Sequence, residues 1–476
     1  MNNFQQIIGI EVHVVVNAKT KMFSHSKSCH YDQINENVSA FDLAMPGLLP
    51  TVNQYVIEKA ICLGKKLNMS ISDELVFDRK NYFYPDLPKG FQITQKFCPI
   101  GINGYLEIKN EKNELKKILI KEIHIEEDTA KQINFDNKIM LDYNRSGMPL
   151  IEIVSDCNIS SSYEAIQYLT KLKQILNFTE ISDAKMEDGS LRADINLSVN
   201  LYGAKTLGTR VEIKNLNSFS NIKKAIEYEV EQHVSSLLLN KPIIQATKKW
   251  DEKSNKTIFM REKTSEKEYH YICEPNIPTI KLTKEFINNA IKSMRFDCDK
   301  IEKDLYQNNV DHKISEILLN NFDLFKIFHY VANKIDDYKL AITWIVIELV
   351  GLLKKDNFPI KNFSKTKIDQ IVIMLKILKE GKINNRQGKK IIIEIYKTNA
   401  SVEHIIDKFN FKQITDEKML NSLLMQIISS NPKLIKEYDT RPEKVEKMII
   451  GKLMEKTKGQ ANPVLSMSLL KNILKK

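Results

Sequence analysis

Strict alternation of polar and apolar side chains constrains the fold of this chain more than any other feature. In residues 190–199, SLRADINLSV, polar and apolar residues alternate from Arg192 to Val199. Because successive side chains of a β-strand point to opposite faces, this pattern predicts a strand with one polar and one apolar face. Further segments, at 7–16, 122–128, 148–156 and 209–215, also place charged residues on one face of a strand that is otherwise rich in apolar residues. Each alone is more typical of a strand with one face in water, but five together indicate a sheet whose polar face has a function.

The polar faces of these segments carry two complementary kinds of charged side chain. The carboxylates and cations are Glu11, Glu126, Glu152, Arg192, Arg210 and Lys214. Hard oxygen ligands beside Arg and Lys suit Mg²⁺ and a polyphosphate, as phosphoryl transfer requires. Glu11 and His13 share one face of the first segment, where metal binding is the favoured interpretation and a hydrogen-bonded core pair is the alternative. The chain has no GxxxxGK[ST] and no GxGxxG motif, so we expect neither a P-loop nor a Rossmann site.

A loop rich in aromatic, proline and lysine residues occupies 77–95, FDRKNYFYPDLPKGFQITQ. Proline fixes φ and glycine frees it, so the pattern predicts a shaped loop between two strand ends. Its two lysines, Lys80 and Lys89, are suited to holding phosphate oxygens as point charges. A solvated turn, whose lysines contact only water, is the alternative.

Apolar residues at helical spacing predict helices over 165–178 and 221–239. The second helix is expected to bury a stripe made of Ile222, Ile226, Val230, Val234 and Leu237. Because these helices interrupt strands without regular βαβ alternation, the predicted fold class is α+β. After Pro278 the patterns become helical, and the apolar run within 338–355 is too short and too flanked by charge to span a membrane.

The length of 476 residues predicts two or three domains. Residues 361–476 hold 24 Lys and Arg against 12 Asp and Glu, whereas residues 1–360 hold 47 against 48. A basic segment beside a neutral one suggests a polyanionic partner, and lysine enrichment from a biased genome explains the excess equally well.

The chain lacks the marks of secretion, of membrane insertion and of a zinc site. Its N-terminus, MNNFQQIIGIEV, has no basic region followed by an apolar core, and no run of about 18 apolar residues occurs, so a cytoplasmic location is expected. The six cysteines are scattered without a CxxC pair. We therefore expect reduced thiols and no zinc site.

The loop at 77–95 also carries a resemblance to a known family. Its string RKNYFYPDLPKG resembles the signature of the B subunits of tRNA-dependent amidotransferases, the GatB family. Similar strings recur in the family order at 8–14, 45–53, 123–128, 142–156, 186–199 and 208–219. From about Asp369 onward, the chain resembles the YqeY-type helical domain, for example in ILKEGKINNRQGKKIIIEIYKTNAS at 377–401.

This resemblance implies a fold and a reaction. It implies a glutamine-synthetase-like catalytic cradle with a mixed or antiparallel sheet at 1–290, an all-α helical domain at 291–368 and an all-α YqeY-like tail at 369–476. The implied enzyme is a ligase that uses ATP and Mg²⁺ to phosphorylate Glu or Asp on misacylated tRNA(Gln) or tRNA(Asn). Ammonia from a partner then gives the amide. The implied partners are an amidase A subunit and a small C subunit, forming a heterotrimer.

The resemblance also assigns roles to residues at matching positions. The implied metal ligands are Glu11, His13, Glu126 and Glu152. The implied catalytic residues are Lys80, Lys89, Glu126 and Arg192, and the implied nucleotide-binding residues are Asn81, Ser190, Asp194, Lys214 and Asn215. Tyr82 and Arg145 either act in the site or brace its loop, while His30, His124 and His270 are left without a role. The tail is expected to hold the tRNA body through phosphates, with Lys382, Arg386, Lys389, Lys390, Lys456 and Lys458 as candidates.

Two alternatives to the amidotransferase remain at this stage. One is a non-catalytic tRNA-binding scaffold descended from the enzyme, which the presence of the acidic and lysine residues above disfavours. The other is a stand-alone carboxylate–amine ligase for a small substrate, which the basic tail disfavours.

Overall fold

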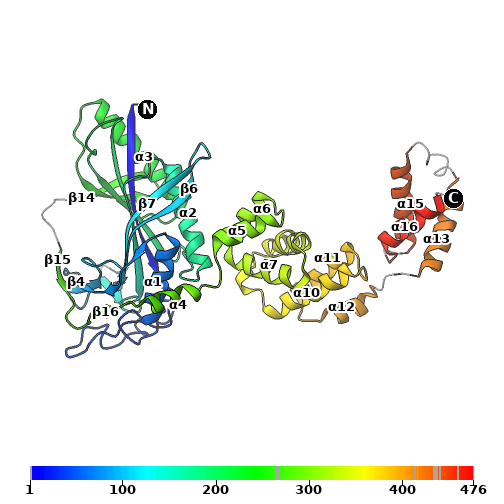
Figure 1. Cartoon of the computed structure of the whole chain (residues 1–476), viewed down its shortest axis with the longest axis horizontal. Coiled ribbons are helices and arrows are strands. Elements are labelled where there is room, and N and C mark those ends of the chain that lie inside the picture. Colours follow the sequence, from blue (N-terminus) through cyan, green and yellow to red (C-terminus); the bar gives the residue numbers. More distant parts are fainter. Residues whose placement is uncertain are drawn as a thin grey trace. The chain divides into compact units, whose positions relative to one another are not determined.

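A computed structural model describes residues 3–136, 138–262, 269–411, 414, 416–432, 438, 441–457 and 460–474. The chain forms two compact units, Met1–Ile301 and Glu302–Lys476. Unit 1 contains the strands together with several helices, and unit 2 is built from helices (Figure 1). The α+β class of the N-terminal part and the helical C-terminal part are therefore confirmed. The further division predicted at residue 368 stays a prediction.

Nine of the described strands of unit 1 form a large sheet in the order β14-β13-β12-β11-β1-β10-β7-β6-β2. Their bounds are β1 Phe4–Val15, β2 Ser70–Ile71, β6 Gly101–Lys109, β7 Leu115–Glu127, β10 Pro149–Ser155, β11 Leu191–Leu201, β12 Val211–Lys214, β13 Ala246–Asp251 and β14 Lys256–Glu262. Among these strands β12 and β13 pair in parallel and the other neighbours pair antiparallel, so the sheet is mixed. The five segments predicted from alternation are β12, β11, β1, β10 and β7, which lie side by side at its centre.

The pairing register places the polar side chains of these central strands on one face. His13 on β1 lies opposite Arg192 on β11 and Glu152 on β10. Glu152 in turn lies opposite His124 on β7. Because paired residues of neighbouring strands point to the same side of a sheet, the polar residues form a continuous row across it.

The opposite face of the sheet is apolar and is covered by helices. Its side chains, such as Ile10, Val12 and Ile195, are at most 1% exposed. Helices α1 (Gln54–Lys66), α2 (Ser162–Phe178) and α3 (Phe219–Leu238) pack on strands of this sheet and on one another (Figure 1). Each begins at a residue whose side chain accepts a backbone N–H, namely Asn53, Ser161 and Ser218.

The buried face of α3 differs from the predicted stripe in its second half. Ile222 and Ile226 are buried as expected, but Glu229 and His233 are buried where Val230 and Val234 were expected. Lys248 and Thr257, from β13 and β14, donate hydrogen bonds to Glu229. A buried carboxylate is tolerated when it is paired in this way, and its partners lie far away in the sequence.

A second, smaller sheet shapes the loop at 77–95. Strands β4 (Asp78–Asn81) and β5 (Phe91–Thr94) stand at its two ends, and β15 (His270–Cys273) pairs with β4. Gly90, with φ +71°, closes the loop, because its N–H bonds Leu87 O and its carbonyl accepts from Tyr82 N. The amide of Ile125 on β7 donates to Gln95 Oε1 at 2.9 Å, which ties the end of this loop to the large sheet. The remaining short strands are β3 Glu74–Leu75, β8 Lys131–Phe135, β9 Lys138–Asp142 and β16 Ile280–Lys281.

The helices that follow the sheet begin in unit 1 and continue through unit 2. Their bounds are α4 Lys284–Lys292, α5 Cys298–Gln307, α6 His312–Leu319, α7 Phe322–Ile335, α8 Tyr338–Ala341, a π-helix Ile342–Leu349, α9 Val350–Lys355, a 3₁₀ turn Ile360–Asn362, α10 Lys365–Lys379, α11 Asn385–Lys397, α12 Val402–Phe409, α13 Glu417–Ser429, α15 Pro442–Lys456 and α16 Pro463–Leu474. In unit 2, Trp344 packs directly on Gly388, where a Cβ would lie 2.5 Å from the indole. Leu424, Ile449 and Leu470 belong to a separate core formed by α13, α15 and α16. Among the described residues, no helix is long and apolar enough to cross a membrane.

Candidate functional site

Three potential metal ligands from three adjacent strands meet on the polar face of the large sheet. His13 Nε2 lies 3.4 Å from Glu126 Oε1 and 3.6 Å from Glu152 Oε2. One ligand atom from each residue lies within 4.8 Å of the other two. An imidazole nitrogen and two carboxylate oxygens that converge in this way fit a divalent cation. We call His13, Glu126 and Glu152 the metal triad.

The electrostatics of the metal triad also favour a bound cation. Burial raises the pKa of Glu126, and the neighbouring charge of Glu152 raises it further. Burial acts in the same direction on Glu152, but His13 and His124 outweigh it and hold the pKa of Glu152 well below its usual range. Two buried carboxylates this close repel each other, and a cation between them would remove that cost.

His124 is a component of the site that sequence reasoning left without a role. Its Nε2 lies 2.7 Å from Glu152 Oε2. Such a contact holds a ligand carboxylate in one orientation, as partners behind metal ligands commonly do. The signal was present in the sequence, because His124 and Glu126 are two residues apart and share a face.

Glu11 belongs to a second acidic cluster beside the metal triad. Carboxylate oxygens of Glu11, Asp194 and Glu212 lie within 4.8 Å of one another. Lys214 pairs with Asp194 and with Glu212, and Asn196 Nδ2 donates to Glu11 Oε1 at 2.9 Å. Burial raises the pKa of Glu11, and the nearby acids Glu152, Glu212 and Asp194 add to the rise. Three of the four predicted ligands thus form the metal triad, and Glu11 is grouped with Asp194 and with Glu212, which the prediction omitted.

Both acidic groups border one cavity of about 470 Å³. Its lining residues come from the large sheet, the small sheet and their loops and are Gly9, Ile10, Glu11, Lys80, Thr94, Gln95, Lys96, Lys121, Glu122, His124, Glu126, Glu152, Val154, Ser155, Asp156, Cys157, Asn196, Arg210 and Tyr271. Gly9 lines this space without a side chain, and a Cβ there would lie in contact with Cys157 Sγ, at 3.5 Å.

Lys80 is the predicted loop lysine that reaches the cavity. Its Nζ lies 4.6 Å from the ring centre of Tyr269 and 5.8 Å from that of Tyr82. Burial disfavours the ammonium form, but Glu126 and other acidic groups outweigh burial and raise the pKa of Lys80. Lys80 therefore supplies a permanent positive charge beside the metal triad.

Lys89 and Arg192 make ion pairs with carboxylates that belong neither to the metal triad nor to the second cluster. Lys89 Nζ lies 2.6 Å from Glu127 Oε2, with both side chains largely buried. Arg192 lies beside His13 in the register, and its guanidinium donates to Asp128 Oδ2 at 2.9 Å. Arg145 pairs with the same carboxylate, also at 2.9 Å.

The predicted residues Asn81, Ser190 and Asn215 bond to backbone groups. Asn81 Nδ2 donates to His270 O at 2.7 Å, and Asn215 Nδ2 donates to Trp250 O at 3.0 Å. Ser190 Oγ accepts from Lys185 N at 2.8 Å and donates to Lys185 O. In this arrangement these side chains brace loops around the site.

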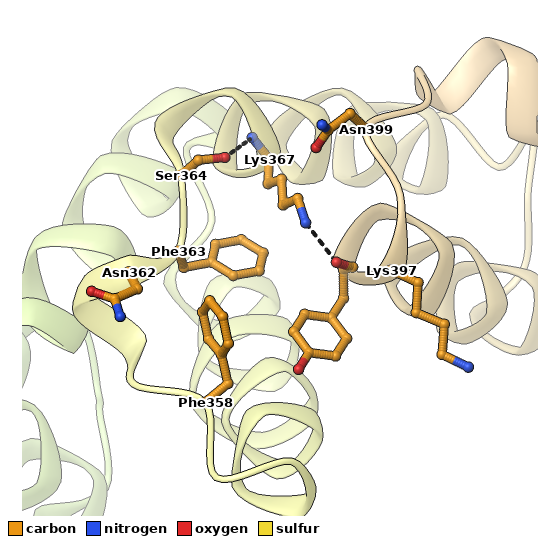
Figure 2. A pocket seen from close by; sticks show the side chains of 8 residues that line it. Phe358, Asn362, Phe363, Ser364, Lys367, Lys397 and Asn399 are labelled. Carbon is orange, nitrogen blue, oxygen red and sulfur yellow. Dashed lines mark hydrogen bonds between the residues drawn. The ribbon is translucent and has the colours of Figure 1, made fainter.

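Unit 2 contains a cavity of about 510 Å³ with a different character. Figure 2 shows the rings of Phe358 and Phe363 facing this space, with Lys367 above them. Lys367 Nζ donates to the carbonyl of Tyr396 at 2.6 Å. The residues that line this cavity of unit 2 include no carboxylate. It therefore lacks the acidic ligands that a metal-assisted reaction needs.

The predicted tRNA-contacting residues of the tail lie on its surface where they are described. Arg386, Lys389 and Lys390 are exposed on α11. Lys389 pairs with Glu348 at 2.6 Å, and Lys382 with Glu380 at 2.7 Å. Lys456 Nζ donates to Gln426 Oε1 at 2.8 Å. Lys458 lies outside the described residues.

Comparisons with known proteins cover nearly the whole chain. Residues 6–288 match the model of the GatB/GatE catalytic domain, and residues 326–474 match that of the GatB domain. The chain is 48% identical over 476 residues to the B subunit of the aspartyl/glutamyl-tRNA(Asn/Gln) amidotransferase of Malacoplasma penetrans, covering all of this chain and 98% of that protein. It is 44% identical over 477 residues to the protein of the same name from Ureaplasma urealyticum, with both chains covered in full. The one from Mycoplasma genitalium is 40% identical over 476 residues, covering all of this chain and 98% of that protein.

Proposed function

The chain belongs to the GatB/GatE family, and from that premise we propose that it is the activating subunit of a tRNA-dependent amidotransferase. Its substrates are ATP and a misacylated tRNA that carries Glu or Asp. A side-chain carboxylate oxygen of that amino acid attacks the γ-phosphorus of ATP, and ADP leaves. Ammonia then attacks the acyl carbon, phosphate leaves, and loss of a proton gives the amide.

The single observation that supports this reaction is that Glu126 and Glu152 of the metal triad, Glu11 of the second acidic cluster and Lys80 all line one cavity. A carboxylate is a poor electrophile at neutral pH, and phosphorylation gives its carbon a good leaving group. Such transfers depend on positioning and on neutralising charge rather than on a protein nucleophile. A cavity lined by fixed ligands and a buried ammonium group meets both needs.

The residues present fit a divalent ion such as Mg²⁺. His13, Glu126 and Glu152 would hold it, and when bound it would neutralise charge on the transferred phosphoryl group. His124 fixes the orientation of Glu152, and Lys80 adds positive charge on the side of the small sheet. Lys214 pairs with Asp194 and Glu212, and its positive charge reduces the repulsion between the second acidic cluster and ATP.

The ammonia comes from a partner in this proposal. The chain has no Ser-Ser-Lys amidase signature, so glutamine hydrolysis falls to an amidase A subunit, joined by a small C subunit. The basic tail, within the proposed segment 369–476, holds the tRNA body through phosphates. Exposed cations on α11 suit that role because phosphate contacts position an RNA without reading its sequence.

The proposal is tested with the complex of this chain and its partner subunits. Phosphate release from γ-labelled ATP and amide formation are measured with and without misacylated tRNA. We expect phosphate release to depend on that tRNA. Glu126→Gln should lower both rates by at least about 100-fold, because losing a metal ligand should reduce activity at least as much as losing a residue that supports a ligand. Binding of the tRNA should stay within about twofold, because its body is held elsewhere.

Glu107→Gln, an exposed acid on β6, is the matched control and should leave both rates unchanged. A rate of phosphate release that is the same with and without misacylated tRNA would contradict the proposal. Wild-type complex that binds tRNA but never releases phosphate would favour a non-catalytic scaffold. Equal loss of tRNA binding and activity in Glu126→Gln would assign Glu126 to folding.

A further inference from the structure

Five aromatic rings form a continuous row beside the cavity. Ring centroids are separated by 6.1 Å for Tyr84–Tyr82, 5.5 Å for Tyr82–Tyr269, 6.4 Å for Tyr269–Tyr271 and 6.5 Å for Tyr271–Phe97. Tyr82 and Tyr84 lie in the loop after β4, Tyr269 directly before β15, Tyr271 within β15, and Phe97 in the loop after β5. We call them the aromatic row.

Much of the aromatic row is open to solvent. The exposed fractions are 56% for Tyr84, 67% for Phe97 and 46% for Tyr269. Isolated exposed rings are ordinary on protein surfaces, but contiguous exposed aromatics mark interaction sites. Because these rings are exposed to solvent, packing in a hydrophobic core does not explain their presence.

The aromatic row reaches the cavity through Tyr271 and is accompanied by cations. Tyr271 and Lys80 pair across β15 and β4, and both line the cavity. Lys96, which also lines it, places Nζ 5.7 Å from the ring centre of Tyr271. A row of rings with ammonium groups beside it has the two elements that bind single-stranded nucleic acid, namely stacking surfaces and charges for the backbone.

We propose that the aromatic row stacks the unpaired nucleotides at the 3′ end of the substrate tRNA. This inference rests on the proposed function, because the amino acid is esterified to that end and must reach the carboxylates of the cavity. Unpaired RNA bases are bound by stacking on aromatic side chains, and every base offers a face for it. Lys96, Lys121 and Arg210 line the cavity and provide charge for the adjoining phosphates.

The length of the aromatic row distinguishes an oligonucleotide end from the base of ATP. Its five rings follow one another at centroid distances of 5.5 to 6.5 Å, and five rings are more than one base can stack on. A strand of several stacked nucleotides matches such an extended surface.

The test removes the two exposed ends of the aromatic row in the complete complex. The variant Tyr84→Leu with Phe97→Leu changes exposed side chains and so spares the core. We expect it to bind a minihelix with an unpaired 3′ end about 10-fold or more weakly, while the KM for ATP stays unchanged. Removing the unpaired nucleotides should weaken binding to the wild type but have no further effect on the variant.

Two controls separate stacking from other causes. Tyr84→Phe keeps the ring and should retain binding of the minihelix. Phe135→Leu, in the β8–β9 hairpin, removes an exposed ring outside the aromatic row and should change neither binding nor KM.

Unchanged binding of the minihelix in the double variant would overturn the inference. A rise in the KM for ATP alone would assign the aromatic row to the base of ATP, and loss of co-purifying subunits would assign it to a protein interface. Minihelix binding needs no ATP, so its outcome is independent of the Glu126→Gln test of the chemistry.

Discussion

Replacing Glu229 with glutamine removes a buried carboxylate that joins helix α3 to the edge of the large sheet. Glu229 is 0% exposed and accepts hydrogen bonds from Lys248 on β13 and Thr257 on β14. His233, one turn further along α3, places Nε2 3.3 Å from Glu229 Oε1. The substitution preserves the size of the side chain and removes its charge, so Lys248 loses its ionic partner.

The size of the effect follows from the pKa of Glu229. Burial raises this pKa, but the contacts with His233, Lys248 and Thr257 outweigh burial and lower it from 4.5 to about 2. A carboxyl group whose pKa is lower in the folded state stabilises the fold above its unfolded pKa and loses this contribution as the pH falls through its folded pKa. The free energy involved is about 3 kcal/mol, fully present at neutral pH and lost between about pH 4.5 and pH 2.

Urea unfolding measured by tryptophan fluorescence tests this reasoning. The chain has two tryptophans, so Trp344→Phe leaves Trp250, which is buried in β13, as the reporter on unit 1. In that background, Glu229→Gln should lower the free energy of unfolding by about 3 kcal/mol at pH 7, and the deficit should shrink as the pH falls from about 5 towards 3. Glu231→Gln, which changes an exposed acid on the same helix, should stay within about 0.5 kcal/mol of its parent. A deficit that does not change over this pH range would refute the assignment of the stability to the ionised carboxylate.

Three further predictions concern the proposed function. Lys80→Met should lower kcat/KM for amidation at least about 10-fold, because it removes the ammonium group beside the metal triad, and steady-state rates that match wild type would contradict this role. Gly9→Val should abolish amidation with an unchanged melting temperature, because the valine side chain fills the cavity next to Cys157. Full activity of this variant would show that this part of the cavity is not used. Combined Arg386→Ser, Lys389→Ser and Lys390→Ser should reduce the slope of log Kd for tRNA against log salt by about 2 to 3, and an unchanged slope would remove α11 from the tRNA-binding surface.

The alternation of side chains was sufficient to predict the central strands and their polar face. His13, Glu126 and Glu152 each lie in a segment that was predicted to be a strand with one polar face, and the structure places these segments on neighbouring strands. Alternation specifies which face a side chain occupies but not which residue lies opposite it. The grouping of Glu11 with Asp194 and Glu212 depends on the register between β1, β11 and β12, which no local pattern encodes.

The side-chain contacts that could not be predicted involve partners that are distant in the sequence. Lys89 looked like a phosphate ligand on its loop, but Glu127 at the end of β7 pairs with it in the structure. The buried face of α3 followed helical spacing as far as Ile226 and then turned towards Glu229, because Lys248 and Thr257 pair with that carboxylate. Both outcomes require the tertiary structure, since the energy of a buried charge depends on what it meets there.

Anomalous X-ray diffraction from crystals of the complex grown with Mn²⁺ and a non-hydrolysable ATP analogue tests the central claim most directly. The account predicts a Mn²⁺ peak in coordinating contact with His13 Nε2 and with carboxylate oxygens of Glu126 and Glu152, with the phosphates of the analogue in the same cavity as Lys80. A metal and nucleotide bound elsewhere on the chain, with the metal triad occupied by neither, would contradict it.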